Sequence, residues 1–527
     1  YNLVGRFEQA SRMFDLVLSG SARKSFKPHR SFAALGKARA IVGHARQEAA
    51  EMEPSAPRAE GEKPEPPLAS PTALNAAKAA YGVSLHEKPD AAWHQETLRE
   101  LALLIEELAE QKAAGLTAAQ AKADPKKKQH VLSREQVRAA LEAARSEALP
   151  HWVKLITQFP KTLHLAEALY HAGVLYSEGP KPDPDKSVAA FERLTKEFPT
   201  SPWTGDAHVR LIDVCLEQQF DLPAAEKHAQ AAVKWLETVD KVTLEKAARP
   251  LGDASSPSTD HRPLTASSVS YAIYVRAGLI EYLNERCPQA VEWFEKAKPF
   301  APERNLVVAY GRIPTGMEKL IDLARSGKFI TPEIVRKGDP RARLILMLAD
   351  VYHEAEQWQK SLDLCTRVIA RTATKPTNQQ RSWAFFKRGR NYFCLDDGAA
   401  RDPDAALSDY VAAVRATPRA GWAAHAMFLG GNIRWNFHRD ADGAVAIWKH
   451  LISAFPKTEE ADCAAYLVGV IYEWSHRNEE AEKAFEEFLQ THPDSRFVGV
   501  ARKHLQAIQS LASAKRAPRS QRGTDKE

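Results

Sequence analysis

The chain has 527 residues, of which 44% are hydrophobic, so it can bury sizeable cores and is not disordered as a whole. No run of about 18 apolar residues predicts a membrane-spanning helix. The formal charge is +6, and half of this excess comes from the last 15 residues, where five basic side chains outnumber two acidic ones. The rest of the chain is nearly neutral, which argues against a dedicated nucleic-acid binder, because such proteins usually carry a basic face.

The N-terminal part reads as the end of one repeat followed by helical segments. Ala10, Phe14 and Val17 have the spacing of a second repeat helix, so we expect the chain to begin inside a repeat that was cut or incompletely traced. Prolines crowd the next segment among Glu, Ala and Ser, which predicts a Pro-rich linker over 52–97. Apolar residues then recur on one helix face, and we expect a helical section with a degenerate repeat over 98–162.

A 34-residue repeat follows and is clearest near the C-terminus. Small residues at positions 8 and 20 let two antiparallel helices approach closely, large residues at positions 11 and 24 fill the space between them, and a proline at position 32 ends the second helix. In the unit from Asp462 to Ser495 these positions are held by Gly469, Tyr472, Ala481, Phe485 and Pro493.

Seven units fit this frame between about residues 163 and 495. Gly173, Gly278, Gly389 and Gly430 hold the first small position in four of them, although some units carry insertions between their helices. The predicted organisation is a partial repeat plus a helix at 1–51, the Pro-rich linker at 52–97, the helical section and degenerate repeat at 98–162, a repeat pair at 163–237, a loop at 238–267, a repeat at 268–303, a helical insertion at 304–340, a repeat array at 341–495, a capping helix at 496–512 and a basic disordered tail at 513–527.

The repeat resembles the tetratricopeptide repeat (TPR), which implies an all-α fold, a right-handed TPR superhelix or α-solenoid with a helical N-terminal section. Phe-Pro followed by Lys or Thr and then Thr or Ser recurs at 159–162, 198–201 and 455–458. This phrase is similar to repeats of bacterial envelope proteins, namely the Tol-Pal cell-division coordinator and the outer-membrane assembly lipoprotein. That resemblance implies a non-catalytic adaptor, often periplasmic.

No motif for nucleotide binding, hydrolysis, zinc or calcium is present, so we expect no catalytic residues, no cofactor and no metal. His164, Glu167 and His171 lie three and four residues apart and could meet at a metal, but a solvated or groove-lining helix face explains them better. Aspartates beside prolines at 183–185 and 402–404 could bind calcium, but helix capping is the simpler explanation.

The repeat geometry points to a candidate binding groove. In TPR proteins, certain positions of the first helices face a concave surface, and here they carry aromatic side chains and arginines, which are common interface anchors. The alternative is that many of these side chains pack against the neighbouring repeat. The candidate groove residues are Tyr170, Trp383, Phe386, Arg390, Phe393, Met427, Arg434, Trp435, Tyr466 and Trp474.

The resulting hypothesis is a protein–protein interaction scaffold or adaptor that holds a partner peptide in this groove, with no small-molecule substrate. Arg390 stands where a chaperone-type carboxylate clamp has asparagine, so a chaperone co-factor is not expected. Two alternatives stay open: a regulatory region of a larger enzyme with its catalytic part upstream, and a nucleic-acid adaptor. The family resemblance favours the bacterial periplasm or cell envelope over the cytoplasm, and peripheral membrane association would need an upstream anchor.

Overall fold

The computed structural model describes most of the chain as helices, with no strand in the described ranges. Its residues fall into two compact units, Tyr1–Asn284 with Gln289–Ala309 and Glu285–Pro288 with Tyr310–Glu527. The all-α class predicted from the sequence is confirmed. The described ranges are 6–19, 29–51, 69–87, 90–121, 134–239, 266–300, 321–371, 374–395 and 401–516.

The first unit is a succession of helices in which most pack on the next one along the chain. None of the described helices is long and apolar enough to cross a membrane. The elements are α1 (Phe7–Ser19), α2 (Arg30–Glu51), α3 (Pro71–His86), α4 (Ala91–Ala121), α5 (Arg134–Ser146), α6 (Leu149–Gln158), α7 (Leu165–Glu178), α8 (Pro184–Glu197), α9 (Thr204–Val214), a π-helical turn (Cys215–Gln219), α10 (Leu222–Thr238), α12 (Ala266–Leu283), α13 (Cys287–Ala297) and a short 3-10 turn (Lys298–Phe300).

The linker expected over 52–97 is interrupted by helix in the structure. Helix α3 begins at Pro71, which occupies the first helical position, where a proline is tolerated because its missing N–H needs no partner. Its apolar face buries Leu74 and Tyr81 in the same core as Leu101 and Leu104 of α4. The expectation of an extended segment was therefore wrong for this part, while residues 52–68 lie outside the described ranges.

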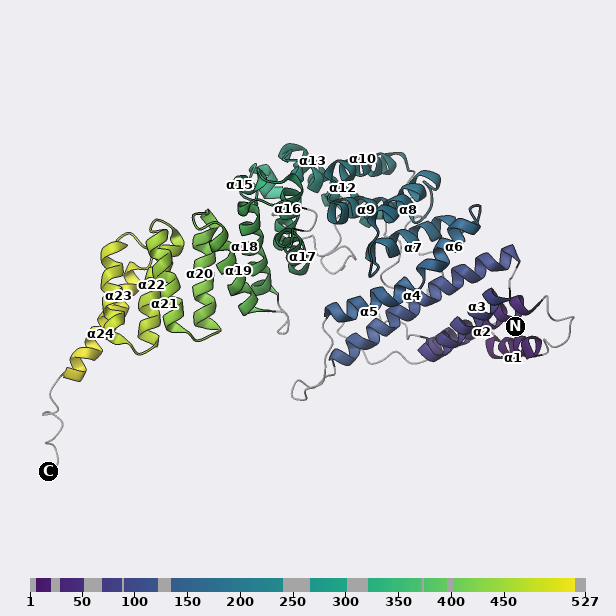
Figure 1. Cartoon of the computed structure of the whole chain (residues 1–527), viewed down its shortest axis with the longest axis horizontal. Coiled ribbons are helices and arrows are strands. Elements are labelled where there is room, and N and C mark those ends of the chain that lie inside the picture. The colour runs from purple at the N-terminus through teal and green to yellow at the C-terminus, as the bar shows by residue number, and fades with distance from the viewer. Residues whose placement is uncertain are drawn as a thin grey trace, which may run out of the picture. The chain divides into compact units, whose positions relative to one another are not determined.

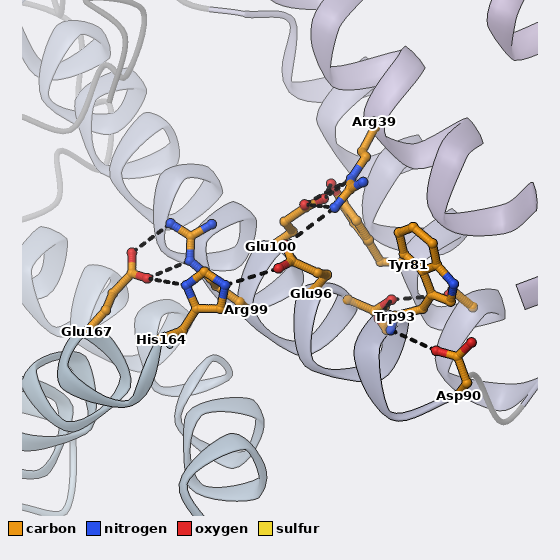
Figure 2. A network of polar contacts seen from close by, with 11 residues as sticks. Arg39, Tyr81, Asp90, Trp93, Glu96, Arg99, Glu100, His164 and Glu167 are labelled. Atoms are coloured by element: carbon orange, nitrogen blue, oxygen red, sulfur yellow. Dashed lines mark hydrogen bonds and ion pairs between the residues drawn. The ribbon is translucent and has the colours of Figure 1, made fainter. Parts of the chain in front are cut away.

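A charged network holds α2, α3 and α4 together (Figure 2). The Arg39 guanidinium of α2 donates to Glu100 of α4 at 2.9 Å and lies 3.4 Å from Glu96. The Tyr81 hydroxyl of α3 donates to the same Glu100 carboxylate at 2.8 Å. Burial, with the neighbouring Glu100 charge, raises the pKa of Tyr81 far above its usual value, so the phenol stays a hydrogen-bond donor.

The second unit is a run of helices that lie side by side from α16 to α24 (Figure 1). The last described helix, α24, packs its Ala501 and Ile508 into the core of the preceding helix pairs. The elements are α15 (Glu333–Arg336), α16 (Pro340–Glu354), α17 (Trp358–Ile369), α18 (Asn378–Cys394), α19 (Pro403–Ala416), α20 (Gly421–Asn436), α21 (Ala441–Ala454), α22 (Glu459–Trp474), α23 (Asn478–Thr491) and α24 (Val498–Arg516).

Five helix pairs have a glycine on the first helix directly beneath an aromatic ring of the second helix. A Cβ placed on Gly469 would lie 2.6 Å from the Phe485 ring, far inside van der Waals contact. Only a residue without a side chain allows the ring this close to the helix backbone. The same contact is made by Gly173 with Phe191, Gly278 with Phe294, Gly389 with Tyr410 and Gly431 with Trp448.

The repeat around residue 430 differs by one residue from the predicted frame. Gly431, and not Gly430, lies beneath the Trp448 ring, whereas the nearest atom to a Cβ on Gly430 belongs to Leu407 at 3.4 Å. Two consecutive glycines make either register possible in the sequence, and a shift of one residue turns the helix face by about 100°.

The recurrent Phe-Pro phrase is a turn between consecutive helices. Phe159, Phe198 and Phe455 are the C-caps of α6, α8 and α21, and their backbone φ values lie between −134° and −128°. In the second copy of the phrase, the Ser201 N–H donates to the Phe198 carbonyl at 3.0 Å. The recurrence of the phrase is thus explained by its local role in ending helices.

Replacing Gly469 by alanine tests the glycine–ring contact. We expect Gly469→Ala to lower the free energy of unfolding by about 1–2 kcal/mol, because overpacking against Phe485 outweighs the gain in helix propensity. Gly82→Ala is the matched control, since nothing lies within 4 Å of a Cβ there, and it should be neutral or stabilising. Denaturant unfolding followed by circular dichroism measures both, and an unchanged Gly469→Ala would contradict the contact.

Candidate protein-interaction surface

The predicted groove residues are divided between the two units. Tyr170 lies in the first unit and the other nine lie in the second. Tyr170 is buried on α7, stacks on Trp203 with ring centroids 4.6 Å apart, and donates from its hydroxyl to Asp206. The structure does not bring Tyr170 together with the other candidates within one unit.

Three more candidates are buried between the helices of the second unit. The Trp383 indole N–H donates to Asp350 Oδ2 at 3.0 Å. The Phe386 ring lies 6.2 Å from Tyr410 and 5.8 Å from His425, and Met427 is also buried. These side chains pack against neighbouring helices, which is the alternative that the sequence left open for them.

The remaining candidates reach the surface to different degrees. Trp474 has 64% of its surface exposed, and Arg390, Phe393, Arg434 and Trp435 are half-buried.

Tyr466 is also half-buried, but α24 and the residue before it cover part of its ring. The ring stacks on Phe497 at 4.8 Å, and its hydroxyl lies 3.3 Å from His504 Nε2. It belongs to the capping contact more than to the open surface.

Two aromatic pairs join the C-terminal ends of α18, α20 and α22. Phe393 meets Phe437 edge to face with ring centroids 5.7 Å apart, and Trp435 lies 6.2 Å from Trp474. Phe437 is 41% exposed, so both pairs present ring surface to solvent. We call this patch, with its arginines, the aromatic–arginine surface; it consists of Arg390, Phe393, Arg401, Arg434, Trp435, Phe437 and Trp474.

The arginines of this surface are only partly neutralised. Arg434 pairs with Asp440 at 3.2 Å. The Arg401 guanidinium lies over the Phe393 ring, 5.4 Å from its centroid. Among the described residues, neither Arg390 nor Arg401 has an acidic partner. The described part of the patch therefore includes two guanidiniums without an acidic partner, beside exposed aromatic rings.

Phe437 and Arg401 were missed by sequence reasoning. Phe437 is the residue that caps the end of α20, and Arg401 precedes α19, so both fall outside the helical positions that define a repeat groove. An aromatic residue two positions after Trp435 was the one available signal for Phe437.

A buried ion pair joins α16 and α18. Lys387 Nζ is 3.1 Å from Asp350 Oδ1, and both side chains are 1% exposed. Thr331 and Trp383 donate to the other carboxylate oxygen. Burial raises the pKa of Asp350, and the Lys387 charge opposes that shift.

His353 of α16 lies close to this pair. Its Nδ1 is 2.6 Å from the amide oxygen of Asn391 on α18. Burial, reinforced by the Lys387 charge, lowers the pKa of His353 to about 4. His353 is thus neutral in the folded protein at neutral pH.

The metal site considered for α7 is replaced by ion pairs with α4. His164 Nε2 lies 3.0 Å from Glu96, Arg99 donates to Glu167 at 2.9 Å (Figure 2), and His171 pairs with a further α4 carboxylate. In the described ranges, no group of three or more His, Cys, Asp or Glu side chains is arranged to hold a metal ion. The aspartates at 183 and 402 cap α8 and α19.

Comparison with known proteins identifies one repeat directly. Residues 167–201, which cover most of α7 and all of α8, match the tetratricopeptide repeat family. The chain therefore contains a tetratricopeptide repeat at these residues, and the helices of the described ranges have the all-α class predicted from the sequence. No curated protein sequence matches the chain.

Several solved structures are similar at low level. A thermophilic TPR protein of Thermus thermophilus is 16% identical, with a TM-score of 0.24 over 46% of this chain and 100% of its own. Yeast Tom70 is 11% identical, with a TM-score of 0.26 over 97% of this chain and 93% of its own. Human IFIT1, solved as a dimer with PPP-AAAA, is 12% identical, with a TM-score of 0.27 over 85% of this chain and 83% of its own. Similarity at this level says nothing about what the chain binds.

A double substitution tests the buried ion pair. Lys387→Met leaves Asp350 buried without its cation and should cost about 3–5 kcal/mol of unfolding free energy. Lys387→Met/Asp350→Leu removes both charges and should recover most of that loss. Guanidinium unfolding of the native protein, the single variant and the double variant measures the coupling energy between the two charges. Equal losses of unfolding free energy in the single and double variants would contradict the ion pair.

The His353 pKa predicts how stability depends on pH. The folded pKa of about 4 lies below the ordinary value of 6.5, so the unfolded chain binds more protons between these values. Stability should therefore fall as pH drops from 6.5 towards 4. Thermal unfolding should show a smaller fall for His353→Gln, and an identical pH profile would refute this assignment.

Proposed function

We propose that the chain is a non-catalytic protein-interaction scaffold that holds a partner peptide on the aromatic–arginine surface. The observation that carries this proposal is the joining of three successive first helices by two exposed aromatic pairs beside incompletely neutralised arginines. Trp, Tyr and Arg are the residue types that contribute most to binding energy in protein interfaces. The TPR architecture supports a protein-interaction role in general.

Trp474, the most exposed ring of this surface, is not part of the hydrophobic core of the second unit, whereas Trp435 packs against that core. The space between paired helices is filled by Tyr410, Trp448 and Phe485 of the second helices. Trp474, by contrast, leaves 64% of its surface in water. A large exposed apolar side chain of this kind gains free energy when a partner covers it.

The finer adaptor role in the bacterial envelope is proposed from the repeat resemblance alone. The Phe-Pro phrase supports that resemblance, and it also serves helix termination in this chain. Binding at the aromatic–arginine surface and a role in the bacterial envelope are thus separate parts of the proposal.

Cross-linked co-purification from the native source tests the surface. Trp435→Ala/Trp474→Ala should reduce capture of the main protein partner about tenfold or more, because loss of two aromatic anchors costs more than 1.4 kcal/mol. The matched control is Val411→Ala/Leu511→Ala, which truncates two exposed apolar residues elsewhere in the same unit. Circular dichroism confirms folding of both, and unchanged capture by the tryptophan variant would overturn the surface assignment.

A further inference from the structure

We infer that the occupant of the aromatic–arginine surface is an acidic, proline-rich peptide. The inference deepens the proposed function by stating the chemistry of the partner, and it rests on that function. Two properties of the surface lead to it: arginines that have no acidic partner in the described ranges, and aromatic rings that are exposed to solvent.

The charge of the surface selects an acidic partner. The half-buried Arg390 guanidinium and the exposed Arg401 guanidinium have no carboxylate partner among the described residues. Of the described carboxylates near the patch, Asp440 pairs with Arg434 and Asp404 lies 3.0 Å from His438. Carboxylates of a partner would pair with the free guanidiniums, and arginine geometry suits such bidentate contacts.

The exposed aromatic rings favour a partner segment that is apolar and conformationally rigid. Trp435 and Trp474 lie 6.2 Å apart at an interplanar angle of 37°, and they do not stack on each other. Ring surface of Trp474 therefore stays open, as does part of Phe437. Proline-rich segments dock on aromatic-lined surfaces of this kind, and they lose little entropy because their extended conformation is preformed.

This chain itself contains a segment with both properties. Residues 52–68 include five prolines and four glutamates against one arginine and one lysine. Pro54 and Pro57, and likewise Pro64 and Pro67, have the P-x-x-P spacing of peptides that bind aromatic grooves. The segment lies outside the described residues, and its sequence supplies a natural probe of the inferred chemistry.

Fluorescence anisotropy with a labelled peptide of residues 51–70 tests the inference. The partner is a full-length variant in which the prolines and glutamates of 52–68 are changed to serine, so that no competing segment is present. We expect saturable binding that weakens as salt increases, because ion pairs between carboxylates and arginines are screened. Replacing the five glutamates of the peptide by glutamine, or its five prolines by alanine, should each weaken binding about tenfold, equivalent to about 1.4 kcal/mol.

Surface variants locate the contact. Adding Trp474→Ala or Arg390→Gln/Arg401→Gln to the full-length protein should weaken binding about tenfold. Leu511→Ala should leave it unchanged, because that residue is exposed on α24, away from the patch residues in sequence. Equal binding of the native, glutamine and alanine peptides, or binding that survives Trp474→Ala, would overturn the inference.

Two further outcomes separate this inference from the proposed function. If the native partner still depends on Trp435 and Trp474 but the peptide fails to bind up to about 1 mM, the acidic, proline-rich chemistry is wrong and the scaffold proposal stands. If sedimentation shows that the unmodified chain self-associates and that the serine-substituted segment abolishes this, a second copy supplies the occupant and the chemistry is supported.

Discussion

The contact between a glycine of one helix and an aromatic ring of the next determines how closely the two helices pack in five of the repeats. At Gly469 and Phe485 the ring occupies the space where any side chain on the first helix would lie. Because the same contact recurs in five helix pairs, the distance within a pair is set by one chemical feature. Because the interior is close-packed, any change in side-chain volume at this contact shifts both helices of the pair. The packing of the other side chains in the pair therefore depends on this contact.

The candidate surface follows from this arrangement. Rings from the second helices fill the space within the pairs, and aromatic residues at the ends of the first helices lie at its edge. Phe393 contacts Phe437 there, and Trp435 contacts Trp474. The buried Lys387–Asp350 pair and its hydrogen bonds fix α18 against α16. A firmly packed layer of helices thus presents a row of partly exposed rings and arginines.

The 34-residue spacing was enough to predict the all-α repeat fold, because the repeat period and its small and large positions are local properties of the sequence. It was not enough to predict burial. Trp383 and Phe386 occupy groove positions of the repeat, yet Asp350 and the neighbouring rings enclose them. Pairing of Lys387 with Asp350 could not be read from the sequence, because charges 37 residues apart meet only through the packing of α18 on α16. Phe437 was missed because it follows the end of its helix.

The central claim is that partners dock on the aromatic–arginine surface and not on another exposed part of the second unit. A photo-cross-linking amino acid placed at position 474 in the native source, compared with one at position 411 on α19, tests this directly, since both side chains are solvent-exposed. The account predicts a specific protein adduct from position 474 and none from position 411. The same adduct from position 411, with none from position 474, would contradict it.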